Sequence, residues 1–69
     1  MISYAPLWAT MAKRQATTYT LQVKGEISSS TIRRLKAGES VSTNTLNTLC
    51  RVLRCTLADV VEYIDDGEP

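Results

Sequence analysis

Helix-capping residues recur at short intervals along this chain, and their spacing restricts its fold more than any other feature. Serine and threonine side chains accept hydrogen bonds from the unpaired N–H groups of a first helical turn, so such a residue before an apolar run marks a helix start. Residues of this kind are Thr17 and Thr18, Ser28, Ser42 or Thr43, and Thr56. Every helix is therefore short, and the chain has to form a bundle of several short helices.

Five helices are expected from these caps and from the spacing of the apolar residues. The expected helices cover residues 6–14, 18–23, 28–37, 42 or 43 to 53, and 56–64. Gly25 helps to end the second helix and Gly38 ends the third, because glycine readily adopts the left-handed backbone that stops a helix. Little in the sequence favours a strand.

The chain has room for one small domain, because the fraction of surface that folding buries falls with chain length. Its 69 residues are 43% hydrophobic and 22% charged, a composition typical of a folded domain rather than of a disordered segment. We expect a single domain over residues 1–69, ordered to about residue 64 and followed by a short acidic tail at 65–69.

Several classes of function are disfavoured by what the chain lacks. It has no histidine and two cysteines, so we expect no zinc site, no enzyme activity, no cofactor and no small-molecule ligand. Cys50 and Cys55 should be reduced thiols on different sides, with Cys50 buried. No apolar run approaches the roughly 18 residues needed to cross a bilayer, and no basic start precedes the N-terminal apolar residues, so we expect a cytoplasmic location without membrane contact.

Charge is distributed unevenly along the chain. Residues 1–36 contain six basic residues against Glu26 alone, whereas residues 37–69 contain two basic residues against six acidic ones. The basic residues of the first part are Lys13, Arg14, Lys24, Arg33, Arg34 and Lys36. A domain charged in this way can turn its basic part towards a polyanion while its acidic part faces away. An ordinary solvated surface is the alternative interpretation.

The segment from Ser28 to Gly38 has the features of a recognition helix. Two short helices joined by a tight turn form a helix-turn-helix unit, whose second helix enters the major groove of DNA. Ile32 and Leu35 lie three residues apart and should pack inward with Ile27. The outward arc then holds Ser29, Ser30, Arg33, Arg34 and Lys36, and no acidic residue.

DNA contacts are expected on this arc and at the neighbouring helix starts. The residues expected to contact bases are Ser28, Ser29, Ser30, Arg33 and Arg34. Arginine forms paired hydrogen bonds with guanine O6 and N7, so Arg33 or Arg34 is the strongest candidate for a base contact. A phosphate contact is the alternative role for one of them. Helix N-termini attract phosphates through their unpaired N–H groups and the helix dipole. The residues expected to contact phosphates are Lys13, Arg14, Thr17, Thr18, Lys36, Thr43 and Asn44. The serines and threonines have an alternative role as simple caps.

The segment from Ile27 to Glu39 resembles the recognition helix and following glycine of Cro/CI-type repressors, the XRE family. The remaining pieces are similar to a small single-domain branch of that family. They are Ile2-Ser3-Tyr4, Pro6-Leu7-Trp8, Val41-Ser42, Thr45-Leu46, Leu49-Cys50, Leu53, Cys55 and Asp59-Val60-Val61-Glu62-Tyr63. The resemblance implies an all-α, five-helix, lambda-repressor-like domain. It also implies a transcriptional regulator that binds an operator in double-stranded DNA, commonly as a dimer on a palindromic site.

By position, the same resemblance puts the serines and arginines of the third helix where the family reads bases, and Thr18 where a phosphate is often held. Two residues depart from the family pattern. Gln22 stands where the second helix usually has alanine, and Glu26 stands where the turn usually has glycine, with Gly25 one place early. A non-glycine residue in the left-handed region costs roughly 1 kcal/mol. Either Glu26 adopts that conformation, or the turn is reshaped around Gly25.

Two further possibilities stay open at the level of sequence. A small protein-interaction module, such as an adaptor or an antitoxin-like partner, can use the same helical scaffold, because fold alone does not fix function. A homodimer is a second possibility, because pairing on two half-sites roughly doubles the interface with DNA. The expected fifth helix has more apolar residues than one core-facing stripe needs, and the surplus serves either a partner or, as the preferred interpretation, the core of the monomer. These residues are Val60, Val61, Tyr63 and Ile64.

Overall fold

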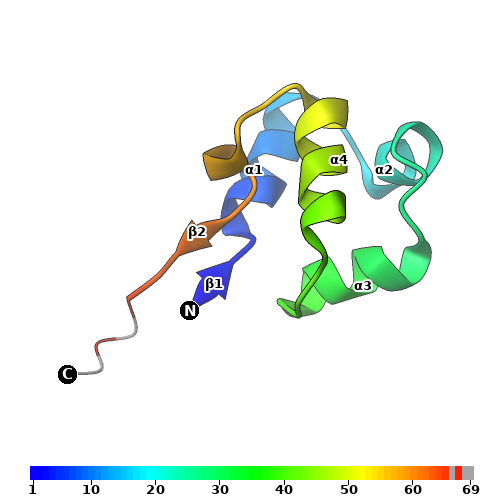
Figure 1. Ribbon diagram of the computed structural model, residues 1–69. Helices are drawn as coiled ribbons and strands as arrows, with labels where there is room; N and C mark the ends of the chain where they lie inside the picture. Colours follow the sequence, from blue (N-terminus) through cyan, green and yellow to red (C-terminus); the bar gives the residue numbers. More distant parts are fainter. Residues whose placement is uncertain (66, 68–69) are drawn as a thin grey trace.

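The computed structural model describes residues 1–65 and residue 67, and it is mostly helical (Figure 1). In chain order the elements are β1 (Ile2–Ser3), α1 (Ala5–Lys13), α2 (Thr18–Lys24), α3 (Ser29–Ala37), α4 (Thr43–Leu53), the 3-10 turn η1 (Leu57–Asp59) and β2 (Glu62–Tyr63). The first four expected helices are therefore present at the expected places. None of the helices in the described part of the chain is long and apolar enough to cross a membrane.

The core takes at least one side chain from each helix and one from the C-terminal segment. The fully buried side chains are Leu7 of α1, Leu21 of α2, Leu35 of α3, Leu49 of α4 and Val60, which follows η1. Ile27, Ile32 and Leu53 pack around them, as the apolar spacing predicts. Because α3 is anchored in this shared core, its orientation depends on the whole molecule and not on α2 alone.

Hydroxyl side chains cap the N-termini of three of the four α-helices in the described part of the chain. The hydroxyls of Thr17, Ser28 and Ser42 each accept a hydrogen bond from the N–H three residues later, at 3.4, 3.2 and 3.2 Å. At the other end of α3, Gly38 has a φ of 76°, in the left-handed region that glycine enters without strain. Local caps thus define both ends of α3, as the sequence predicts.

The expected fifth helix over residues 56–64 is wrong, and with it the five-helix architecture. Leu57–Asp59 forms a short 3-10 turn, and Glu62–Tyr63 forms a strand that pairs antiparallel with β1, with Ile2 opposite Tyr63. This ribbon joins segments from the two ends of the described chain, so no local periodicity predicts it. Its strands have two residues each, in line with the expectation of little strand. The backbone groups of this segment find partners across the ribbon instead of within a helix.

The C-terminal segment closes one side of the bundle. η1 packs against α1 and α4, and the Thr10 hydroxyl donates a hydrogen bond to the backbone carbonyl of Asp59 at 2.7 Å. The pairing continues past the two strands, because the Ile64 N–H donates to the Met1 carbonyl at 2.7 Å and the N-terminal amine donates to the Ile64 carbonyl. The acidic tail expected at 65–69 lies mostly outside the described residues.

The structure decides between the two conformations that the sequence left open for the turn between α2 and α3. Glu26 has a φ of 53°, in the left-handed region, whereas Gly25 has a φ of −96°. Glu26 therefore adopts the left-handed conformation itself. Gly25 is needed for a different reason, because a Cβ at that position would stand 2.8 Å from the carbonyl oxygen of Leu21 and 3.2 Å from Cγ2 of Thr48. The missing side chain lets the turn pack closely against α4.

Cys50 and Cys55 are free thiols, and both are half-buried, so Cys50 is more exposed than expected. Burial, and then the proximity of Cys50, raises the pKa of the Cys55 thiol. The two side chains therefore lie close together, and the expectation that they point to different sides is wrong. The reason is the loop after α4, which turns back so that the Cys55 N–H donates to the Cys50 carbonyl at 3.1 Å.

Candidate nucleic-acid interface

α3 turns two apolar side chains inward and leaves a polar arc exposed. Ile32 and Leu35 are buried in the core. The exposed residues of α3 are Ser29, Ser30, Arg33, Arg34, Lys36 and Ala37, which we call the recognition face. No residue of α3 is acidic, and the acidic residues nearest in sequence, Glu26 and Glu39, lie beyond its two ends. The structure therefore gathers the predicted arc into one exposed and positively charged surface.

The recognition face consists of two stripes, because residues three and four apart share one side of a helix. Ser29, Arg33 and Lys36 form the stripe next to α2, where all three line a shallow groove between the two helices. Ser30 and Arg34 form the second stripe, on the side away from that groove. The two arginines thus lie on different flanks of the helix.

The groove between α2 and α3 has a volume of about 220 Å³. Its lining residues are Thr18, Gln22, Ser29, Ile32, Arg33 and Lys36. Thr18 is the first residue of α2, so the groove sets the start of that helix beside two cations of α3. A hydroxyl, unpaired N–H groups and cations are groups that hold a phosphate. The predicted contacts Thr18, Arg33 and Lys36 are therefore brought together.

Gln22 belongs to this surface, although the sequence reasoning did not place it among the site residues. Its side chain is exposed and lines the groove together with Arg33. A signal was present in the sequence, because Gln22 replaces the alanine that the related pattern has there, and a buried carboxamide without partners is costly. Such a residue has to face solvent, where its amide can bond a base edge or a phosphate.

Hydroxyl groups at the N-terminus of α3 form hydrogen bonds with one another and with the backbone of the first turn. The Ser28 hydroxyl accepts a hydrogen bond from the Thr31 N–H, donates one to the Thr31 hydroxyl at 3.0 Å and lies 3.1 Å from the Ser30 hydroxyl. Ser28 is exposed, but its hydroxyl already works as the cap. Ser29 has its exposed hydroxyl in the groove, so the three serines differ in how free they are to bond DNA.

Three more predicted phosphate contacts lie at helix starts. Thr17 is the cap of α2 and forms a capping box with Thr20. Thr43 and Asn44 are exposed in the first turn of α4, which Ser42 caps. Figure 1 shows that the loop from α3 leads directly into this end of α4. These side chains therefore flank the recognition face at two of its borders.

Lys13 and Arg14 lie elsewhere. The Arg14 guanidinium donates a hydrogen bond to the backbone carbonyl of Arg54 at 3.0 Å, at the C-terminal end of α4, and Lys13 and Arg14 line a hollow together with Asp59. Because α3 joins the opposite end of α4, which at 1.5 Å per residue is roughly 16 Å long, these two cations are separated from the recognition face (Figure 1).

Asp59 is held in its ionised form at that far end. Hydrogen bonds from the Thr56 N–H and the Thr56 hydroxyl, each at 3.1 Å, lower the pKa of its carboxyl, and the nearby charges of Lys13 and Arg14 lower that pKa further. Thr56 therefore caps a helical segment as expected, through its pairing with Asp59, although this segment is a 3-10 turn and not an α-helix. The acidic and basic parts of the chain meet here, away from α3.

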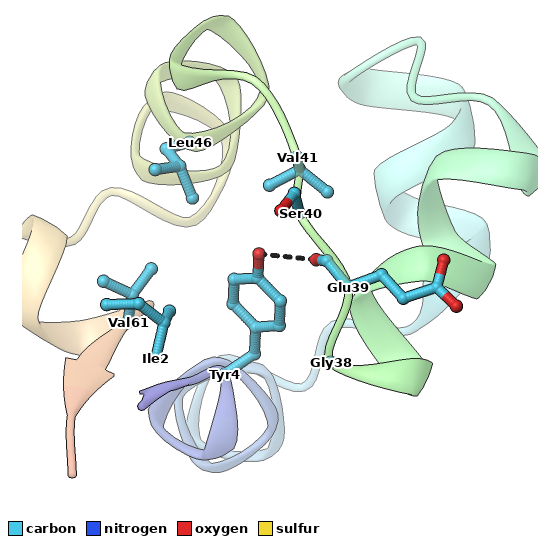
Figure 2. Close-up of a pocket in the computed structure, with 8 residues that line it drawn as sticks. All are labelled: Ile2, Tyr4, Gly38, Glu39, Ser40, Val41, Leu46 and Val61. Carbon is cyan, nitrogen blue, oxygen red and sulfur yellow. Dashed lines mark hydrogen bonds between the residues drawn. The ribbon is translucent and has the colours of Figure 1, made fainter. Parts of the chain in front are cut away.

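The loop after α3 is fixed by a contact with the N-terminal segment. The Tyr4 hydroxyl donates a hydrogen bond to the backbone carbonyl of Glu39 at 2.8 Å, as Figure 2 shows. This contact ties the C-terminal end of α3 to the residue between β1 and α1. Within the described residues, no group of three or more His, Cys, Asp or Glu side chains is placed to hold a metal ion.

Comparisons with known proteins agree with this geometry. The family model of the Cro/C1-type HTH DNA-binding domain matches residues 6–66 of the chain. Among solved structures, the chain is similar to the transcriptional regulator VanUg in its crystal form II, with a TM-score of 0.85 and 29% sequence identity over 94% of this chain and 87% of that one. A search of curated proteins found no match. The likeness covers nearly the whole chain and not the α2–α3 unit alone.

Proposed function

Because this chain belongs to the family of Cro/C1-type helix-turn-helix DNA-binding domains, we propose that it is a sequence-specific transcriptional regulator that reads double-stranded DNA through α3. The similar solved structure is that of a transcriptional regulator, which supports this role. We propose further that the protein acts in the cytoplasm as a single non-enzymatic domain over residues 1–69, and that it represses its target by occupying an operator.

The observation that carries the proposal is the recognition face itself. Its residues are exposed, no carboxylate stands among them, and α3 is anchored from behind by Ile32 and Leu35. A rigid helix with a polar, positively charged outer side fits the major groove, which is about wide enough for one α-helix.

We assign different contacts to the two stripes. Arg34 and Ser30, away from α2, are proposed to meet base edges, and Arg34 is suited to paired hydrogen bonds with guanine. Arg33 lies in the groove beside Thr18, where it can bond either a base edge or a phosphate. Ser28 and Ser29 are proposed to contact bases at the start of the helix, with Ser28 acting mainly through its position as the cap.

Phosphate contacts are proposed at the borders of the recognition face. These contacts come from Thr17, Thr18, Lys36, Thr43 and Asn44. Helix starts and a cation at these places would hold the DNA backbone and set the orientation of α3. Lys13 and Arg14 are proposed to act at longer range, through an attraction that salt screens.

We also propose that two copies bind one operator. A single domain of this size makes few base contacts, and two recognition helices on half-sites one turn of DNA apart, roughly 34 Å, would roughly double the interface.

Selection of duplexes from a random-sequence library, followed by titration of the selected duplex, tests the function. We expect an affinity that falls steeply as salt rises. Arg33→Ala and Arg34→Ala should each weaken binding by about 1–3 kcal/mol and relax the preference at one base pair. Arg51→Ala, which removes an exposed arginine near the other end of α4, is the matched control and should change affinity little.

The proposal is wrong if the protein selects no duplex, or if both variants bind every duplex as the wild type does. A protein-interaction module built on the same scaffold would give the first of these results.

A further inference from the structure

Three of the four α-helices in the described part of the chain end in the same way. Each is followed by one residue with a left-handed backbone, and the N–H of the next residue donates a hydrogen bond to the carbonyl five residues before it. The left-handed residues are Gln15 after α1, Gly38 after α3 and Arg54 after α4. The hydrogen bonds run from Ala16 to Met11 at 2.8 Å, from Glu39 to Arg34 at 2.8 Å and from Cys55 to Cys50 at 3.1 Å.

This kind of helix end commonly brings two side chains together. The left-handed residue turns the chain back over the last helical turn, so the residue that donates the hydrogen bond lies beside the residue that accepts it. At the end of α1 the two residues are Met11 and Ala16, which both pack in or against the core. At the end of α4 they are Cys50 and Cys55, so the same backbone geometry sets two thiols side by side.

The surroundings of the two thiols leave them able to react. Cys50 and Cys55 are both half-buried against the core, and their thiols are within hydrogen-bonding reach of each other. Half-burial leaves each sulfur open to a small reagent. The two thiols belong to no group of three or more metal-ligating side chains among the described residues, so a zinc site with four protein ligands is not built here.

We propose that Cys50 and Cys55 are a dithiol that a small disulfide oxidant, such as glutathione disulfide, closes to an intramolecular disulfide bond. The bond joins the C-terminal end of α4 to the segment that carries η1 and β2. The inference does not depend on the proposed function, because the two thiols lie at the end of α4 that is away from α3 (Figure 1).

The reaction is a sequence of two thiol–disulfide exchanges. A thiolate of the chain attacks one sulfur of glutathione disulfide, and one glutathione leaves as its thiolate. The second cysteine, as its thiolate, then attacks the chain sulfur of the mixed disulfide, and the second glutathione leaves. Two electrons pass from the two cysteines to glutathione disulfide, and the two protons that the cysteines lose are taken up by the two glutathione thiolates.

Cys55 is suited to the second of these attacks. Burial, then the neighbouring Cys50 and the carboxylate of Asp59, raise the pKa of the Cys55 thiol, and the charge of Arg14 lowers it in part. Cys55 is therefore mostly protonated near pH 7, and a protonated thiol is not the attacking species. Once Cys50 is part of the mixed disulfide, its negative charge no longer opposes the ionisation of Cys55.

Mass spectrometry of the full reduced chain, incubated with graded ratios of glutathione disulfide to glutathione, tests the proposal. Free thiols are alkylated before the measurement. We expect a product that has lost two hydrogen atoms, takes up no alkylating reagent and is not linked to a second chain. Cys55→Ser should stop at the mixed disulfide with glutathione.

A variant with one thiol moved around α4 is the matched control. Cys50→Ser combined with Arg51→Cys keeps two cysteines in the chain but places one of them about 100° further around the helix, at an exposed position. This variant should need a ratio of oxidised to reduced glutathione that is higher by about tenfold or more, because its sulfurs no longer face each other. Circular dichroism confirms that the variant is folded.

The unfolded chain provides a comparison that needs no substitution. The equilibrium constant for closure should be larger in the folded wild type than in the same chain in urea, by about tenfold or more, because the fold holds the two thiols together. An equal or smaller constant in the folded chain overturns the proposal. So does the accumulation of mixed disulfides alone, or a control variant that closes as readily as the wild type. None of these measurements uses DNA, so their outcome is separate from that of the proposed function.

Discussion

The recognition face and the β1–β2 ribbon differ in how each of them forms. The recognition face consists of residues from one helix of nine consecutive residues, and it is polar, basic and backed by Ile32 and Leu35. The ribbon joins residues from both ends of the described chain, and it carries the apolar pair Ile2 and Tyr63 beside the polar pair Ser3 and Glu62. The comparison teaches that one small domain can combine a surface that a single helix forms locally with an element that forms only when distant segments of the chain meet.

The two regions share one core, and the largest predicted effect tests this connection. Leu35→Ala removes a fully buried side chain of α3 and should reduce the free energy of unfolding by about 2–5 kcal/mol. A domain of this size has a free energy of unfolding of about 3–10 kcal/mol in total, so the variant should lose much of its stability. Urea denaturation measures the change, and Leu57→Ala, at a half-exposed position in η1, should shift it by less than about 0.5 kcal/mol. Equal effects of the two variants would show that α3 is not anchored as described.

Substitutions at two neighbouring residues of the turn before α3 should change the stability of the domain by smaller amounts, and with opposite signs. Glu26→Gly should raise stability by up to about 1 kcal/mol, because glycine removes the strain of the left-handed backbone at φ 53°. Gly25→Ala should lower stability by about 1–3 kcal/mol, because the new Cβ meets the Leu21 carbonyl oxygen at 2.8 Å. Thermal melts followed by circular dichroism measure both. The same sign for both variants would contradict this description of the turn.

The smallest effect concerns the turn that leads into the ribbon. The pKa of Asp59 is lowered by its hydrogen bonds from Thr56, so its contribution to stability is present above the ordinary carboxyl pKa of about 4 and is lost as pH falls through the lowered value. Asp59→Asn should therefore melt below the wild type near pH 7, and the gap should close on acidification towards about pH 2. A gap that stays constant with pH would exclude the ionised carboxyl as its cause.

The local parts of the fold are predictable from the sequence, and the non-local parts are not. Ser28 and Gly38 bound α3 through contacts with residues of their own helix, so their pattern can be read without knowing the fold. The pairing of Ile2 with Tyr63 depends on two segments at opposite ends of the chain. The apolar residues after Thr56 satisfy helical spacing just as well, and this led to the incorrect fifth helix.

The candidate site shows the same division. The exposed arginines of α3 follow from the burial of Ile32 and Leu35, because a helix with two inward positions must turn the others outward. Gln22 joins that surface only through the packing of α2 on α3. Arg14 leaves it because the end of α1 lies against the end of α4, where Arg14 bonds the Arg54 carbonyl. Neither the placement of Gln22 nor that of Arg14 can be inferred from the distribution of charge along the sequence.

The sequence by itself determines where the four α-helices begin and end and which side of α3 is polar, because caps and helical periodicity act between residues at most a few positions apart. Only the tertiary structure decides that both ends of the chain form a ribbon, that Glu26 and not Gly25 takes the left-handed conformation, and that the cations of α1 lie far from α3. Those outcomes depend on which distant side chains compete for the same space and the same hydrogen-bond partners, and that competition exists only once the chain has folded.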